Sequence, residues 1–219
     1  MRYTTVIFDL DGTLLNTLED IKDSVNATMR HFGYAERSLD EIRAFVGNGA
    51  GNLIARCLPG GRDEPGFDDI LAWYDGYYTE HSLIKTAPYP GIIDLLRELN
   101  RREFKLAVVS NKQDPVVKTL ARKFFSGLIS VAVGESAGVA RKPAPDSVLS
   151  AMRELWSEPF ECVYVGDSEV DIATARAAGI PCISVSWGFR SRELLKDHGA
   201  ATIISKPSEL LKGAVKKVQ

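Results

Sequence analysis

Two aspartates follow a short apolar run near the start of the chain, at a spacing that could do chemistry. Asp9 and Asp11 stand two residues apart, directly after residues 4–8, which are apolar or β-branched. An unpaired charge at the end of a buried strand is expensive, and a hard cation such as Mg²⁺ would offset the repulsion between two carboxylates. Gly12 would let the backbone turn there. The pattern predicts either a site for a metal and an anion or an acidic turn that caps the next element.

A second pair of aspartates repeats this arrangement later in the chain. Asp167 follows the apolar run 162–165 and a glycine, and Asp171 comes four residues after it. If a helix begins at Ser168, Asp171 lies in its first turn, close to Asp167. Both acids could then face one cation. Alternatively, Asp171 only complements the helix dipole, which would leave Asp167 at the end of an apolar strand unexplained.

Polar residues that could bind an anion follow two other segments. Ser110 and Asn111 end an apolar run. Asp114 and Pro115 are typical of the N-cap and first residue of a helix, whose free N–H groups favour anions. Lys142 stands directly before a proline. These residue types suit a phosphate group, although a turn with its cap and a solvated lysine would account for them as well.

The elements that would position these residues are short apolar runs separated by helical patterns. The runs indicate strands buried on both faces, because they are nearly continuous rather than alternating. Strands that alternate with helices predict a parallel sheet, in which ligands bind at the carboxyl ends of the strands. The expected strands are 4–8, 104–109, 128–133, 162–165, 181–185 and 201–204, and the expected helices include 91–101, 145–155 and 168–178.

One region has helical periodicity and no convincing strand. We expect residues 16–85 to form an all-helical cap domain inserted into an α/β core made of residues 1–15 and 86–219. Ser38 with Glu41 predicts a capping box inside the insertion, and the proline-rich residues 87–91 suit a stiff joint on the return. Residues 212–219 are expected to end a last helix.

Composition and charge exclude several classes of protein. The chain has 219 residues, 45% of them hydrophobic, with 27 basic and 29 acidic side chains, which predicts one or two folded domains and no nucleic-acid or membrane partner. Three widely spaced cysteines without a C-x-x-C pair argue against disulfides and structural zinc, and favour the cytoplasm. No apolar run is long enough to span a membrane.

Four motifs in order resemble those of phosphatases of the haloacid dehalogenase superfamily, and most closely the phosphoglycolate phosphatases within it. The motifs are Asp9-x-Asp11-Gly-Thr, Ser110, Lys142 before proline, and Gly-Asp167-Ser-x-x-Asp171. The resemblance covers essentially the whole chain and includes the helical insertion after the first motif. It implies a doubly wound, mostly parallel sheet with a helical cap, and a Mg²⁺-dependent phosphomonoester hydrolase that forms an aspartyl-phosphate.

The resemblance also implies a role for each of these residues. Asp9 would be the nucleophile and Asp11 the general acid and base, and both would hold Mg²⁺ together with Asp167. Ser110, Asn111 and Lys142 would bind phosphate, and Asp171 would support the metal and orient Lys142. In the cap, residues 45–50 resemble the glycine-rich loop of phosphoglycolate phosphatases, although a tight turn between helices at residues 47–49 explains them equally well.

The substrate that the resemblance favours is 2-phosphoglycolate, hydrolysed to glycolate and phosphate. Pyrophosphatases, sugar-phosphate phosphatases and mutases of the same branch share the core motifs and remain alternatives. A more remote alternative is a signalling module that accepts a phosphoryl group without turnover. The expected partner is a small phosphorylated metabolite, and the expected assembly is a monomer or a homodimer. Arg43 and Arg56 could meet a substrate carboxylate, but charges on a solvated helix surface explain them more simply.

Overall fold

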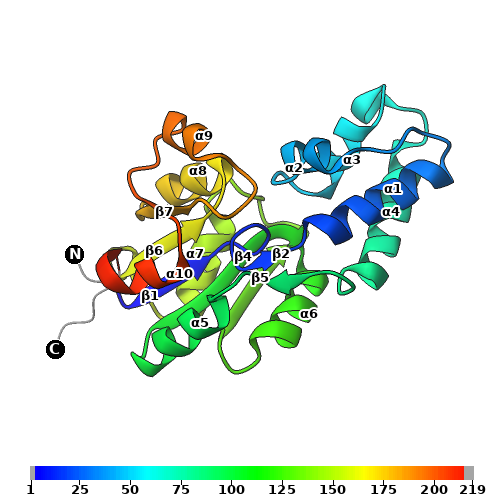
Figure 1. The fold of residues 1–219 in the computed structure, drawn as a ribbon. Coiled ribbons are helices and arrows are strands. Elements are labelled where there is room, and N and C mark those ends of the chain that lie inside the picture. Colours follow the sequence, from blue (N-terminus) through cyan, green and yellow to red (C-terminus); the bar gives the residue numbers. More distant parts are fainter. Residues whose placement is uncertain (1–2, 215–219) are drawn as a thin grey trace. The chain divides into compact units, whose positions relative to one another are not determined.

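Residues 3–214 are described by the structure, a computed structural model, and their largest element is a six-stranded sheet (Figure 1). Neighbouring strands pair in parallel throughout. The strand order β5-β4-β1-β6-β7-β8 reverses its direction of winding between β1 and β6. The predicted doubly wound, mostly parallel α/β fold is therefore confirmed. The strands are β1 (Thr5–Phe8), β4 (Lys105–Gln113), β5 (Val131–Glu135), β6 (Cys162–Gly166), β7 (Cys182–Val185) and β8 (Ile203–Ile204).

Helices connect these strands and bury them. Ile7, Ala107 and Val109 lie on the same face of the sheet, because alternate residues of a strand point to the same face. The helices α7 (Asp146–Glu154) and α8 (Glu169–Ala177) pack on this face. Tyr164 of β6 belongs to the same buried cluster. The helical elements of this unit are α5 (Ile92–Arg101), α6 (Asp114–Phe125), α7 (Asp146–Glu154), η2 (Pro159–Glu161), α8 (Glu169–Ala177), α9 (Arg192–Asp197), α10 (Pro207–Glu209) and η3 (Leu210–Ala214).

The strand β4 is longer than its apolar run predicts. We expected it to end at residue 109, but it continues to Gln113, so Ser110 and Asn111 lie in extended chain rather than in a turn. Its pairing with β5 is irregular between Val109 and Gln113. Ser110 and Asn111 are buried, and their polar side chains are tolerated in this stretch because they are hydrogen-bonded.

The helix α6 also begins differently from the prediction. Asp114 is its first residue rather than its N-cap, and Gln113 takes the flanking position. The Asp114 carboxylate accepts a hydrogen bond from Gly134 N at 3.0 Å and pairs with Lys118 at 2.7 Å. The predicted N-cap was wrong, because the Asp114 side chain connects α6 to β5 and does not cap the start of α6.

A second unit is all-helical among the described residues, apart from the short strands at its two ends. The predicted capping box is present, with Ser38 and Glu41 bonding to each other's backbone. Gly47 and Gly49, which connect α2 to α3, have φ of 120° and 79°, a conformation that favours glycine. The helical elements are α1 (Leu18–His31), α2 (Leu39–Phe45), α3 (Ala50–Cys57), η1 (Gly61–Asp63) and α4 (Phe67–His81).

The chain divides into two compact units at Leu15 and Pro88. One consists of the residues up to Leu15 and those from Pro88 onward, and the other is Asn16–Ala87. The short strands β2 (Leu15–Asn16) and β3 (Ala87–Pro88) pair where the chain crosses. The helical unit extends two residues beyond the expected limit of 85. Within it, the Asp20 carboxylate accepts hydrogen bonds from the backbone N–H groups of Lys85 and Thr86, which tie that segment to α1.

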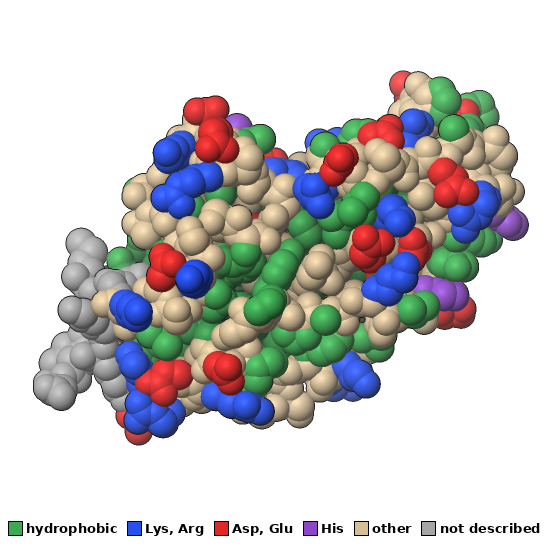
Figure 2. Space-filling model, in the orientation of Figure 1, with side chains coloured by type: hydrophobic (Ala, Val, Ile, Leu, Met, Phe, Trp, Pro, Cys, Tyr) green, Lys and Arg blue, Asp and Glu red, His purple; other side chains and the backbone are tan. Residues whose placement is uncertain are grey.

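Further sequence expectations concern the cysteines, the surface and the chain end. The three cysteines are free thiols, and burial raises the pKa of Cys162 to about 11. Across the described residues, no helix is both long and apolar enough to cross a membrane. Figure 2 shows basic and acidic side chains interspersed over the displayed face. The helical end expected for residues 212–219 lies mostly outside the described residues.

Candidate active site

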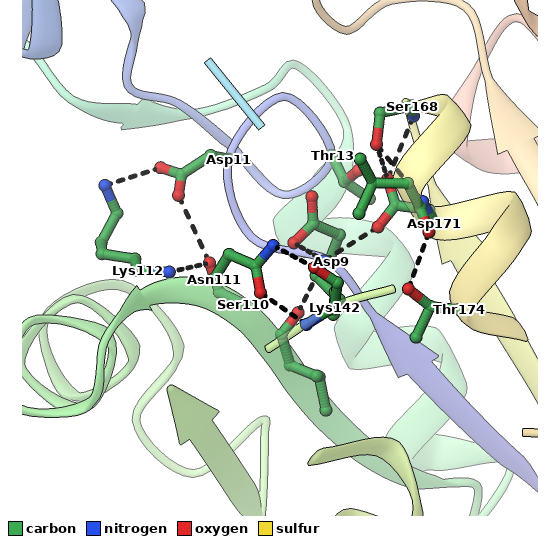
Figure 3. Close-up of polar contacts among 12 residues, drawn as sticks. Asp9, Asp11, Thr13, Ser110, Asn111, Lys112, Lys142, Ser168, Asp171 and Thr174 are labelled. Carbon is green, nitrogen blue, oxygen red and sulfur yellow. Dashed lines mark hydrogen bonds and ion pairs between the residues drawn. The ribbon is translucent and has the colours of Figure 1, made fainter. Parts of the chain in front are cut away.

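The carboxyl ends of β1, β4 and β6 bring the predicted site residues together (Figure 3). Asp9 follows β1 and Asp167 follows β6, on the two strands between which the winding reverses. The Asp9 N–H donates to Val165 O at 2.8 Å, which holds the two strand ends side by side. Ser110 and Asn111 come from β4. Ligands bind at such a reversal point in open α/β sheets.

A buried lysine ammonium links the two acidic motifs. Lys142 Nζ donates to Asp9 Oδ1 at 2.8 Å, to Asp171 Oδ1 at 2.9 Å and to Tyr164 Oη at 3.0 Å. The lysine is only 3% exposed. Burial by itself would lower the pKa of Lys142, but Asp171 and Asp9 together raise it well above its ordinary value. The ammonium is therefore charged at neutral pH and neutralises part of the acidic cluster.

Both carboxylate oxygens of Asp171 accept hydrogen bonds from neighbouring residues of the site. Its Oδ2 accepts hydrogen bonds from Ser168 N at 3.0 Å and Ser168 Oγ at 2.6 Å, while Oδ1 accepts from Lys142. Ser168 Oγ accepts in return from Asp171 N, so the pair forms a capping box at the start of α8. Asp171 thus completes the capping box of α8 and binds the Lys142 ammonium at the same time.

Asp167 is held by contacts from two loops. Its Oδ1 accepts from Thr13 Oγ1 at 3.1 Å and its Oδ2 from Phe189 N at 2.7 Å. Burial, with a contribution from Asp171, raises the pKa of Asp167 to about 7. Burial and Asp171 likewise raise the pKa of Asp9, against the opposing effect of Lys142. Ionising both Asp9 and Asp167 is therefore unfavourable in the site without a cation.

Asp11 points away from this cluster, toward the end of β4 (Figure 3). Its Oδ2 accepts a hydrogen bond from Ser110 Oγ at 3.4 Å, and its Oδ1 lies 3.0 Å from Lys112 Nζ. The second contact is an ion pair by distance but lacks the alignment of a hydrogen bond, because Asp11 Oδ1 has no hydrogen-bond partner among the described residues. Ser110 Oγ also accepts from Lys112 N at 3.2 Å. Ser110, Lys112 and Asp11 thus form one connected group.

Asn111 joins the Lys142 loop to the sheet. Its side-chain amide donates to Lys142 O at 3.0 Å, and its side-chain oxygen accepts from Lys142 N at 2.8 Å. This reciprocal pair fixes the backbone from which the buried ammonium extends. The predicted role of Asn111 as a phosphate ligand stays a prediction, and the structure gives it a second task in placing Lys142.

The family model of haloacid dehalogenase-like hydrolases matches residues 6–185, which contain every site residue predicted from the sequence. The chain belongs to this family. It is 32% identical over 215 residues to the phosphoglycolate phosphatase of Pseudomonas putida strain KT2440, covering 95% of this chain and 78% of the relative. It is also 31% identical to the phosphoglycolate phosphatase of Aquifex aeolicus, covering 94% of each chain.

The fold comparison agrees with this assignment. A crystal structure from Lactobacillus delbrueckii subsp. bulgaricus matches this haloacid dehalogenase-like hydrolase with a TM-score of 0.92 at 34% identity. The match covers 99% of this chain and 100% of the other. The two proteins therefore share their fold over nearly their whole lengths.

The donor set of this hydrolase fits a hard divalent cation. Asp9, Asp167 and Asp171 each offer an oxygen, and these oxygens all lie within 4.8 Å of one another in a buried site. Carboxylate oxygens are the ligands that Mg²⁺ prefers. Each of these carboxylates also accepts hydrogen bonds from the protein: Asp9 and Asp171 from Lys142, and Asp167 from Thr13 and Phe189.

Several residues of the site carry no signal that the sequence analysis recognised. Lys112 directly follows the predicted Ser110 and Asn111, but no role was predicted for it. Tyr164 sits inside an apolar strand, where an aromatic residue predicts only core packing. The loop containing Phe189 reaches Asp167 from more than twenty positions away in sequence, so no local pattern could reveal its contact.

Gly188 permits that loop to approach Asp167. A Cβ at this position would lie 2.3 Å from Asp167 Cβ and 2.4 Å from Gly12 O. We expect Gly188→Ala to lower the thermal unfolding midpoint by roughly 5 °C, because overpacking of this kind costs about 1–3 kcal/mol, and to raise the Mg²⁺ concentration needed for activity. Differential scanning calorimetry and a metal titration would measure both.

Gly76→Ala is the matched control for this substitution. Gly76 lies in α4, and a Cβ there would have no other atom within 4 Å. Alanine should leave the protein unchanged or slightly stabilise it, since alanine is the better helix former. Equal behaviour of the two variants would show that the space beside Gly188 does not constrain Asp167.

Proposed function

We propose that this hydrolase is a Mg²⁺-dependent phosphomonoesterase that cleaves 2-phosphoglycolate to glycolate and phosphate. The observation that carries the proposal is the buried Asp9 carboxylate, 2.8 Å from the Lys142 ammonium and grouped with Asp167 and Asp171. A nucleophilic carboxylate needs positive charge beside it to meet a phosphate dianion. The two phosphoglycolate phosphatases similar over most of the chain support the choice of substrate.

The residues of the site suggest a two-step displacement. The Asp9 carboxylate attacks phosphorus and the bond from phosphorus to the glycolate oxygen breaks, which leaves an aspartyl-phosphate. Asp11 enters this step in its protonated form, gives its proton to the departing glycolate oxygen, and is left as the carboxylate that pairs with Lys112. Asp11 then takes a proton from a water molecule that attacks phosphorus, so that phosphate leaves and the Asp9 carboxylate is restored. Lys142 and Ser110 bind the phosphoryl oxygens throughout.

Mg²⁺ fits this proposal through the chemistry of its ligands. Asp9, Asp167 and the backbone carbonyl of Asp11 would hold the ion. When bound, Mg²⁺ supplies positive charge that offsets the repulsion between the Asp9 carboxylate and the phosphate dianion. We further propose that the helical unit of residues 16–87 is the cap domain, whose task is to exclude bulk water from the reaction.

A phosphate-release assay tests the proposed function. Rates would be measured with and without Mg²⁺ on 2-phosphoglycolate, pyrophosphate, a hexose 1-phosphate and an activated aryl phosphate. A strong Mg²⁺-dependent preference for 2-phosphoglycolate is the expected result. Preference for pyrophosphate or the hexose phosphate would instead assign this protein another activity of the same branch. Stable labelling of the protein without turnover would favour a phospho-acceptor module.

Mg²⁺ should stabilise the protein more at pH 8 than at pH 5. Burial raises the pKa of Asp167 to about 7 and the pKa of Asp9 above its ordinary value. A carboxyl group with a raised folded-state pKa stabilises the fold fully below its unfolded-state pKa of about 4, and this contribution is lost as pH rises through about 7. The metal-free protein should therefore lose stability from about pH 4 to pH 7, and a cation should restore it where the acids are ionised.

The measurement is the unfolding midpoint with and without saturating Mg²⁺ at each pH, at constant ionic strength. We expect a rise of roughly 5–10 °C at pH 8, the effect of a ligand at about 100 times its dissociation constant, and a much smaller rise at pH 5. Asp167→Asn should abolish most of the rise at pH 8. A rise of the same size at both pH values would show that the acidic cluster is not where the ion binds.

A further inference from the structure

Lys112 is a second cation of the site, and the proposed mechanism gives it no task. Its side chain is only 9% exposed, and its Nζ lies 3.0 Å from Asp11 Oδ1. Burying a lysine ammonium is costly unless charged or polar partners surround it. Its position is fixed from β4, because the Lys112 N–H donates to Ser110 Oγ. Lys112 is therefore a built part of the site and not a solvated surface charge.

The two lysines serve different sides of the reacting centre (Figure 3). Lys142 binds Asp9 and Asp171, on the side of the nucleophile and the acidic cluster. Lys112 pairs with Asp11, on the other side. In the proposed mechanism Asp11 protonates the departing oxygen, so the leaving group lies against Asp11. Lys112 is then a cation on the side where the leaving group lies.

We propose that Lys112 binds the carboxylate of the leaving group and thereby selects a small phosphorylated carboxylic acid; this inference rests on the proposed function. In 2-phosphoglycolate the carboxylate is one carbon away from the bridging oxygen. An ammonium has three N–H donors, so Lys112 can face Asp11 and the substrate carboxylate together. The charge-assisted hydrogen bond to the substrate favours an acid over an uncharged analogue of the same shape.

The test compares 2-phosphoglycolate with its amide, 2-phosphoglycolamide, which keeps the size of the substrate and lacks the carboxylate charge. The variants are Lys112→Met, Lys112→Gln and Lys112→Arg, with Lys118→Met as the control. Lys118 is an exposed lysine of α6 that pairs with Asp114, so its replacement removes the same charge outside the site. Circular dichroism would establish that each variant is folded.

We expect Lys112→Met and Lys112→Gln to lower the ratio of kcat/KM for the acid to kcat/KM for the amide by about 10- to 100-fold, the range of a hydrogen bond between charged groups. The change should fall mainly on KM for the acid. Lys112→Arg should retain most of the preference because it keeps the charge, and Lys118→Met should match the wild type.

Two results would overturn the inference in different ways. In the first, the wild type prefers the acid, but the ratio of the two kcat/KM values in Lys112→Met and Lys112→Gln stays within about threefold of its wild-type value. The carboxylate is then bound elsewhere. If kcat/KM also falls in parallel on both substrates, Lys112 only positions Asp11. If the wild type turns over the amide as well as the acid, the proposed substrate itself fails, and the inference fails with it.

Discussion

We expect Asp9→Asn to abolish phosphate release from 2-phosphoglycolate, with a loss of at least about 10⁴-fold in kcat, while the protein remains folded. The amide of asparagine is a far weaker nucleophile than a carboxylate and cannot form the acyl-phosphate bond. Losses of this size are typical when the attacking group of a covalent mechanism is removed. The same variant should take up no phosphoryl label from substrate, because the label would sit on the Asp9 oxygen.

The fold should survive this substitution because the buried negative charge of Asp9 lowers the stability of the metal-free protein. Asp9 is 8% exposed, and burial together with Asp171 raises its pKa. Asparagine has nearly the same shape and removes that charge. Lys142 keeps its contacts with Asp171 and Tyr164. We therefore expect an unfolding midpoint equal to that of the wild type or higher when Mg²⁺ is absent.

The matched control is Asp94→Asn, on the exposed side of α5. The Asp94 side chain is 86% exposed and its carboxylate lies 3.8 Å from Arg97, so the same chemical change there should leave activity unaltered. Mass spectrometry would exclude deamidation of the introduced asparagine back to aspartate, which restores the wild-type mass. A deamidation-free Asp9→Asn protein with more than about a tenth of wild-type activity would assign the attack on phosphorus to another group.

Sequence patterns predicted the parts of the site that lie at strand ends. Asp9 and Asp167 each follow a nearly continuous apolar run, and a charged residue in that position is costly enough to need an explanation. Parallel topology then brings such residues to one edge of the sheet. The same reasoning found Ser110 and Asn111, although it placed the end of β4 too early because polar residues break the apolar pattern before the strand stops.

The contacts that organise the site could not be predicted in the same way. Tyr164 looks like a core residue and is one, yet its hydroxyl also contacts the Lys142 ammonium. Phe189 holds Asp167 through a backbone N–H, which every residue except proline possesses. The order of strands in space determines both contacts, and local periodicity contains no information about it.

Lys142→Met should reduce activity by at least about 10³-fold and also destabilise the fold. The ammonium pairs with Asp9 at 2.8 Å and with Asp171 at 2.9 Å in a buried site. Removing one partner of a buried ion pair typically costs about 3–5 kcal/mol, because the remaining charge is left without compensation. For a chain of this size, that cost corresponds to a fall in the unfolding midpoint of roughly 6–20 °C.

A double variant shows whether the stability loss arises from the unpaired acids. Asp171→Asn removes one of the two charges that Lys142→Met leaves behind, so the combined variant should unfold at a higher temperature than Lys142→Met alone. Activity should remain lost in both, because the phosphate ligand is missing from each. Strictly additive stability effects would mean that Lys142 and Asp171 do not interact energetically.

Lys142→Arg separates charge from geometry in the same position. Arginine retains the positive charge and should recover part of the stability, but its planar guanidinium is larger than an ammonium and has a different donor geometry. Lys142 Nζ serves Asp9, Asp171 and Tyr164 from a single nitrogen. We therefore expect activity to stay below about a tenth of the wild-type value in Lys142→Arg. Recovery of full activity would show that the site requires only a cation there, and that the positions of the Tyr164 hydroxyl and the Asp171 carboxylate do not matter to phosphate binding.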